Sequence, residues 1–398
     1  MPWILLFLFL LALPSPGSAY FDEDWEIKPH YLAEEAFFDL LAYQYPADWE
    51  QRFTAQRNGL RSTVGSISME DFYQHLEVHL AQDLGSDLDF GYHYEETSLY
   101  KPTRPSQEAY LAWGRPWRFD LLGFPSQDKS QGDLGWAVGY GRRHETKYFR
   151  ASRLYQNALY NEKRKTDEVS AVLDEAVVTP VTDRVEWVWR EEGGYFLAGE
   201  AIWEHRAEHR WLEPELTRSH QAQKLRLRGE WGGEQALGIK AISDRQRRTQ
   251  VSAEQERTAQ DLGFYWLEAY GRTTLLEKLQ IQLGSQRGRF ENQITADRAA
   301  DRYQNKLDSA QLYGQIRYRS SAHSEWFTSL QAGPSHLVKR FDDSNNDIDS
   351  QTTQLKASLG YLLSKLDRWQ LYLNSTWDLD VIHYRQWDGG NLMVQMFF

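Results

Sequence analysis

The sequence has 398 residues, a formal net charge of −12 and no cysteine. The negative charge argues against a nucleic-acid partner, because basic side chains dominate nucleic-acid binding. Without cysteine, a disulfide framework, a thiolate metal site and a c-type haem attachment are excluded. Mean hydropathy is −0.68, yet 14% of the residues are aromatic. A polar chain rich in Trp and Tyr suits a membrane barrel, whose strands have one wet face and whose rims favour amphipathic rings.

An apolar run over residues 3–13 has the length of the core of a secretory signal peptide. It is too short to cross a bilayer as a helix. The small residues Gly17 and Ala19 follow it and precede Tyr20, although no basic residue stands before the run. We expect export and removal of residues 1–19; the alternative is a buried N-terminal helix.

Residues 20–70 differ from the rest of the chain. Residues 32–41 have helical spacing, a second short helix is possible over 47–53, and the first part of the segment is acidic. The segment is too short for a stable domain. It can be a partly ordered leader, a plug in the lumen of a barrel, or a docking element for a periplasmic partner.

From residue 71 onward, period-two alternation and turn residues predict β-strands. Residues 177–189, 312–318, 355–363 and 369–379 show the cleanest alternation. We place about sixteen strands, with 14–18 as the range, and an even number is expected when both ends lie on the same side. They are 71–83, 87–97, 107–122, 132–143, 145–159, 176–191, 194–209, 221–232, 234–249, 260–272, 274–291, 307–320, 323–341, 352–364, 367–383 and 388–398.

The connections alternate short and long after the fourth predicted strand. Long ones fall near 160–175, 210–220, 250–259, 292–306 and 342–351, after odd-numbered strands. Outer-membrane barrels have short periplasmic turns and long outer loops, so this rhythm places the N-terminus in the periplasm. The connection at 160–175 follows the fifth predicted strand and is the third outer loop in this count. In sixteen-stranded porins, which this count resembles, the third loop folds inward and narrows the pore; the mixed charges of 160–175 suit either such a constriction or a solvated surface loop.

The last strand, 388–398, ends the chain on two Phe. Leu392, Val394, Met396 and Phe398 share one apolar face. A free apolar edge invites pairing with other chains, so this strand needs a partner within the sheet, and pairing with the first strand closes a barrel. The stretch resembles the C-terminal strand of Gram-negative outer-membrane β-barrels. That resemblance implies that these four residues form the signal read by the barrel assembly machinery.

Charged residues alternate with apolar ones on several predicted strands. Lysine or arginine on the lipid face at mid-membrane costs about 2–4 kcal/mol, so we expect these side chains to point into the lumen. They either select solutes or pair across strands and fill the interior. The candidates for the pore lining on these strands are Lys224, Arg226, Arg228, Glu200, Glu204 and Arg317.

Two histidine groups remain. His75, Glu77 and His79 share a face of one predicted strand, and a hairpin would bring His93 beside them, so all four are further candidates for the pore lining. Such a cluster can bind a divalent metal or titrate near neutral pH, but polar lumen residues produce it easily, and we predict no metal site and no cofactor. Residues 205–209 read His-x-x-Glu-His, a zinc-protease pattern that requires a helix, whereas here it continues a strand.

Together these features predict an all-β, transmembrane, antiparallel up-and-down barrel over 71–398, in contact with the lipid of a Gram-negative outer membrane. The favoured function is a porin-like channel that passes small hydrophilic solutes by diffusion. The alternative is a sleeve or export port for a protein, polysaccharide or electron-carrier partner, which the extra segment 20–70 favours. An outer-membrane hydrolase comes third, since no Gly-x-Ser-x-Gly elbow or phosphate loop is present, and we predict that the protein is not an enzyme.

Overall fold

The computed structural model describes residues 58–397, apart from gaps within that range. The gaps are 67–71, 86, 100, 103–105, 126–131, 143–144, 160–175, 179–180, 192, 211–216, 252–255, 299–301, 342–346, 366–367 and 380–386. The predicted signal peptide, the helical spacing at 32–41 and the loop at 160–175 therefore lie outside the described residues. Within the described residues, no helix is long and apolar enough to cross a membrane.

The described part of the chain forms twenty strands in one sheet. The first ten are β1 Gly59–Ser66, β2 Phe72–Gly85, β3 Leu88–Leu99, β4 Lys101–Pro102, β5 Ser106–Trp113, β6 Trp117–Pro125, β7 Gly132–Tyr140, β8 Lys147–Leu159, β9 Ala176–Val178 and β10 Val181–Glu191. The other ten are β11 Tyr195–Arg210, β12 Thr217–Trp231, β13 Gln235–Val251, β14 Arg257–Leu275, β15 Leu279–Ala296, β16 Tyr303–Ser321, β17 Ser324–Phe341, β18 Ile348–Lys365, β19 Trp369–Asp378 and β20 Trp387–Phe397.

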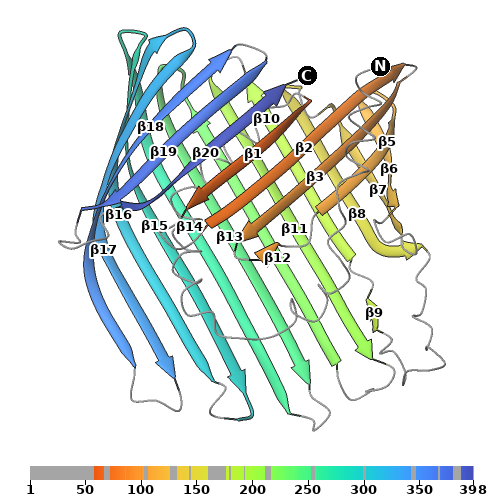
Figure 1. Ribbon diagram of the computed structural model, residues 1–398. Helices are drawn as coiled ribbons and strands as arrows, with labels where there is room; N and C mark the ends of the chain where they lie inside the picture. The colour runs from red at the N-terminus through yellow and green to blue at the C-terminus, as the bar shows by residue number, and fades with distance from the viewer. Residues whose placement is uncertain are drawn as a thin grey trace.

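The sheet is closed. β1 pairs antiparallel with β2 on one side and with β20 on the other, where Gly59 faces Phe397 and Ser66 faces Gly390. In Figure 1 the first and last strands lie side by side. The short β4 pairs with the same strand as β5, and the short β9 with the same strand as β10. The fold is therefore an eighteen-stranded antiparallel barrel.

Alternation along each strand separates an inner face from an outer face. On β13, Lys240 and Ile242 are buried, whereas Leu237 and Ile239 are exposed. Successive side chains of a strand point to opposite faces, so the exposed aliphatic side chains lie outside and the charged ones inside. The predicted apolar face of the last strand is likewise outward, with Leu392 and Met396 exposed and Met393 buried.

Two errors separate the predicted sixteen strands from the eighteen observed. β1 lies within the segment 20–70, so the barrel starts at Gly59 and not at residue 71. The single strand predicted at 107–122 is two strands, β5 and β6, joined by a turn that holds Gly114 at φ 95° and a cis bond before Pro116. The positive φ at Gly114 favours glycine because it has no Cβ.

The alternation of short and long connections extends around the whole barrel. One end carries short turns, such as 276–278 and 322–323, and the other carries the longer connections; Figure 1 shows the short turns at the top. The connection at 160–175 follows the seventh strand of the barrel, so it is the fourth connection at the long end and not the third. The comparison with the third loop of sixteen-stranded porins therefore does not hold.

The barrel is taller on one side. β13 to β18 have 17–19 residues, whereas β5, β6 and β7 have 8, 9 and 9. At ~3.3 Å per residue, a strand of 19 residues is about 60 Å long, roughly twice what a tilted strand needs to cross the hydrocarbon core. The long strands therefore extend beyond a membrane at the end with the longer connections.

Candidate functional site

The inner surface of the barrel divides into two walls of different chemistry. From β2 to β14 the lumen-facing positions carry carboxylates and basic side chains, which we call the charged wall. From β15 to β20 they carry mostly amides and hydroxyls, which we call the amide wall. None of the lumen-facing side chains of β15 is charged. Lys339 and Lys356 are buried cations on the amide wall.

On the charged wall, carboxylates lie between basic side chains of neighbouring strands. Glu200 is only 2% exposed and pairs with Arg184 and, at 3.1 Å, with Arg226. Glu230 accepts a hydrogen bond from Tyr270 at 2.8 Å and pairs with Arg272. The wall is thus lined by charges that compensate one another in place, as buried charges require.

On the amide wall, four glutamines on four successive strands form a ladder. Gln286 on β15 donates to the side-chain oxygens of Gln311 at 2.7 Å and Gln331 at 2.8 Å. Gln311 donates to Gln354 on β18 at 3.0 Å. Gln311 both accepts and donates, so the ladder links hydrogen bonds across four strands without any charge.

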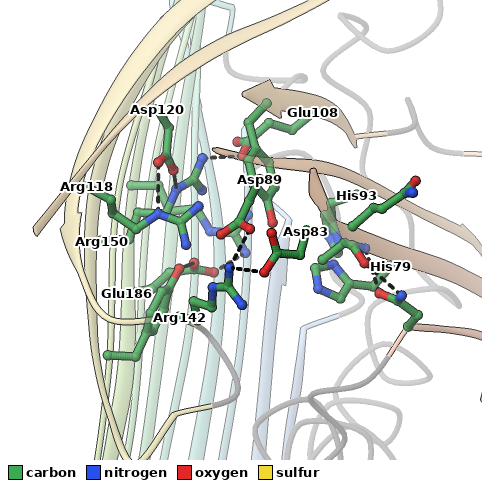
Figure 2. Close-up of a pocket in the computed structure, with 16 residues that line it drawn as sticks. His79, Asp83, Asp89, His93, Glu108, Arg118, Asp120, Arg142, Arg150 and Glu186 are labelled. Atoms are coloured by element: carbon green, nitrogen blue, oxygen red, sulfur yellow. Dashed lines mark hydrogen bonds and ion pairs between the residues drawn. The ribbon is translucent and has the colours of Figure 1, made fainter. Parts of the chain in front are cut away.

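A cavity of about 480 Å³ opens on the charged wall. Its lining side chains come from β2, β3, β5, β6, β8 and β10, from the turn after β7 and from Asn58 just before β1, and they converge on one space (Figure 2). Five carboxylates and four arginines line it: Asp83, Asp89, Glu108, Asp120, Glu186, Arg118, Arg142, Arg150 and Arg184. With its two histidines neutral, the lining carries a net charge of four minus five, or −1.

The arginines of the cavity bridge its carboxylates. Arg142, in the turn after β7, lies 2.6 Å from Asp89 and 3.0 Å from Asp83. The hydrogen bond from Arg142 to Asp89 raises the pKa of Arg142, which keeps this guanidinium charged. Deeper in the wall, Arg150 donates to Asp120 at 2.8 Å and also to Glu108. Dashed lines in Figure 2 mark these contacts.

The predicted histidine cluster forms in part at this cavity. His79 and His93 face each other across β2 and β3 with ring centroids 6.2 Å apart. Glu77 lies 4.0 Å from His93 and also pairs with Arg61. The side chain of His75 is outside the described residues. In the described part of the chain, no three His, Asp or Glu side chains are arranged to hold a metal ion.

The other candidate residues lie on the inner face, but not in one place. Arg226 and Arg228 are buried, and Lys224 lies 3.7 Å from Asp244. Glu204 lies 3.9 Å from His220, and Arg317 approaches Glu325 to 3.8 Å near the short-turn end. The pattern at 205–209 lies on strand β11 and not on a helix.

Sequence reasoning missed most of the cavity. Asp120, Arg118 and Arg150 were not candidates, although each alternates with an outward aromatic residue, Phe119 or Phe149. That alternation was a usable signal for an inner position. The sequence does not show that these side chains converge on one cavity, because their convergence depends on the register in which β7 pairs with β6 and with β8.

The outer surface carries a continuous apolar belt. Exposed aromatics lie close to the short-turn end on several strands, and they include Trp113, Trp117, Trp189, Tyr195, Trp231, Tyr318 and Trp326. Eight residues further along β11, Trp203 is also exposed, after Leu197. Eight residues of a tilted strand rise roughly 20 Å, close to the height of the apolar band of an outer-membrane barrel between its two aromatic girdles.

The chain is a transmembrane β-barrel of the outer-membrane type. Its closed sheet leaves no free edge in lipid, and its exterior is apolar whereas its interior carries charged and amide side chains.

No family model matches the sequence, and no curated protein matches it. Among solved structures, the chain is similar to OccK2 of Pseudomonas aeruginosa in complex with glucuronate, at 13% identity over 85% of this chain and 96% of that one, with a TM-score of 0.40. It is similar to the translocator domain of the autotransporter NalP from Neisseria meningitidis at 9% identity, over 91% and 99%, with a TM-score of 0.35. OmpT with loop L8 deleted, an outer membrane protein of Vibrio cholerae, matches at 10% identity over 86% and 97%, with a TM-score of 0.37. These likenesses are too weak to assign a family.

Proposed function

We propose that the barrel is a passive channel for small hydrophilic solutes across the outer membrane. The observation that carries the proposal is the combination of eighteen closed strands with an inner wall of charged and amide side chains. A barrel of this strand number is too wide for its own side chains to fill. A wide lumen with a polar wall holds water, and water carries polar solutes.

The cavity on the charged wall is the proposed station for a solute in transit. Its arginines and carboxylates alternate, so it offers both donors and acceptors to a solute without a large net field. The net charge of −1 gives a weak preference for cations. The candidates His79 and His93 belong to this station, whereas Arg226, Arg228 and Glu200 line the neighbouring part of the wall.

One observation favours the second candidate function, a sleeve around an occupant. Five apolar side chains on the lumen-facing positions of β13 to β16 pack together, and they are Ile242, Phe264, Trp266, Phe290 and Leu307. These side chains are 0–8% exposed, so an apolar cluster stands where the wall of an open channel would be polar. An occupant of the lumen, either residues 20–57 or a partner, would pack against this cluster.

Planar-bilayer recording separates the two functions. The mature chain is compared with a variant that lacks residues 20–57, a deletion that ends before β1. Steady ohmic current from the full-length chain supports the channel. Current that appears only after the deletion supports a lumen filled by residues 20–57. The absence of current from both barrels refutes diffusion and supports a sleeve whose occupant is a separate partner.

A further inference from the structure

The outer face of β13 to β16 carries a group of charges just beyond the apolar belt. Its basic members, which we call the outer basic patch, are Arg245, Arg247, Arg287, Arg289 and Lys306. All five alternate with lumen-facing residues on their strands, so they point away from the lumen. Arg245, Arg247 and Arg287 are exposed, and Arg289 and Lys306 are partly exposed.

The position of the patch along the membrane normal follows from the exposed aliphatic residues on the same strands. Leu237 on β13, Leu283 on β15 and Leu312 on β16 are 68%, 64% and 71% exposed. All three lie nearer to the short-turn end than the basic residues of their strands. The patch therefore begins where the apolar belt ends. A cation on the lipid face costs several kcal/mol at the midplane but only about 0–1 near the interface, which places these side chains at the level of the lipid headgroups.

Three carboxylates share this surface but do not neutralise it. Asp261 lies 3.7 Å from Arg247, and Asp308 lies 3.2 Å from Lys306 and 3.8 Å from Arg289. Glu291 accepts a hydrogen bond from Arg289 at 2.7 Å. Five bases minus three acids leave a charge of +2, on a chain whose total formal charge is −12. A local positive excess on an acidic protein points to an anionic ligand.

Two arginines of the patch, Arg245 and Arg287, make no ion pair among the described residues, and no carboxylate lies directly opposite either of them. The neighbours of Arg245 across β12 and β14 are Gln223 and Gly263. Those of Arg287 across β14 and β16 are Leu267 and Ala310. Both guanidinium groups are thus exposed beside neutral neighbours. The four strands span about 15 Å at ~4.8 Å per spacing, a width that suits one phosphate-bearing lipid headgroup.

We propose that the outer basic patch binds the phosphate group of a lipid headgroup, with Arg245 and Arg287 as its main anchors. Guanidinium groups bind phosphate oxygens in a bidentate, charge-assisted manner, which an ammonium group does not match. The acyl chains of that lipid would lie along Leu283 and Leu312. The proposal depends on membrane insertion but not on conduction, so a barrel that carries no current leaves it intact.

The test uses the full mature chain, refolded in a neutral detergent. Retention of phosphatidic acid, a lipid with a phosphate monoester, is measured by native mass spectrometry against phosphatidylcholine. The variants are R245Q, R287Q and their combination. The control is R153Q, which removes an outward arginine that already donates to Asp183 at 2.6 and 2.7 Å. Heat-modifiable migration on a gel confirms that each variant is folded.

Each basic residue near a charged lipid surface contributes about 1 kcal/mol, so the double variant is expected to bind phosphatidic acid about 30-fold more weakly. Each single variant loses about fivefold, and R153Q stays within twofold of the parent. Equal retention by the parent and the double variant overturns the proposal. Complete displacement of the lipid by millimolar inorganic phosphate also overturns it, because the patch would then be a site for free anions.

Discussion

Glu200 is the residue whose neutralisation tests the charged wall most directly. It is 2% exposed and lies between Arg184 and Arg226. The substitution E200Q removes a counter-charge of the buried Arg226 and one of the two carboxylate partners of the partly buried Arg184, which keeps Glu186 at 3.0 Å. Breaking a buried ion pair from one side costs about 3–5 kcal/mol, so E200Q is expected to lower the free energy of unfolding by that amount. The matched control is E204Q on the same strand, whose side chain is 33% exposed and lies 3.9 Å from His220; it is expected to cost at most about 1 kcal/mol.

The assay is urea unfolding of the barrel from lipid vesicles, followed by its Trp fluorescence. With a slope of ~3 kcal/mol per M, E200Q lowers the midpoint by at least about 1 M. In a bilayer, the same variant shifts the reversal potential towards anion selectivity if the wall faces a conducting lumen. The reasoning is refuted if E200Q and E204Q unfold within about 0.5 kcal/mol of each other, because Glu200 would then not be a buried counter-charge.

Five further substitutions, in three tests, probe the inner and outer faces by the same unfolding assay. G91A is expected to destabilise by about 1–3 kcal/mol, because a Cβ at Gly91 would lie 2.0 Å from the Tyr110 ring; G271A, whose Cβ has only Leu237 at 3.7 Å, should be nearly neutral. L283R, on the outer face, should cost about 2–4 kcal/mol, whereas Q282R, on the inner face, should cost less than about 1; equal effects would mean that the two faces are assigned wrongly. Q311L removes two bonds of the glutamine ladder and should cost about 1–2 kcal/mol, and a neutral result would show that the ladder is dispensable.

The sequence was sufficient to predict a closed antiparallel barrel, because alternation is a local property of each strand. It failed at β1, which has only eight residues, with Leu60 and Val64 as its outward aliphatic side chains. Such a short and weakly apolar strand is hard to separate from the segment before it. The structural pairing with β20 and β2, and not its own pattern, identifies it.

The fusion of β5 and β6 into one predicted strand has a different cause. Glu108 and Tyr110 before the turn, and Arg118 and Asp120 after it, face the lumen at even positions. A turn of three residues preserves this parity, so the alternation continues through it without a break. Gly114 and Pro116 were the available signals, since both residue types mark turns.

The prediction missed two strands, and missing an even number leaves the order of short and long connections unchanged. Both precede residue 132, so every later strand keeps its odd or even rank, and the long connections still follow odd-numbered strands. This explains why the predicted order of short and long connections agrees with the structure although the strands placed were two fewer than those observed. The ordinal number of each loop changes, however, and the constriction suggested for 160–175 depended on that number.

The sequence predicts which face of each strand lines the lumen, but not which side chains contact one another on that face. Charged residues on alternate positions identify the inner wall, but which ones meet depends on strand register. Arg226 lies opposite Glu200 because β11 and β12 align Phe196 with Glu230. A shift of one residue would turn every inward side chain of β12 outward, so the buried charges fix the register as much as the register positions the charges. The ion pairs of the charged wall and the glutamine ladder therefore both help to determine the strand register, whatever solute the barrel passes. Conductance measurements separate this structural role from a role in solute selectivity.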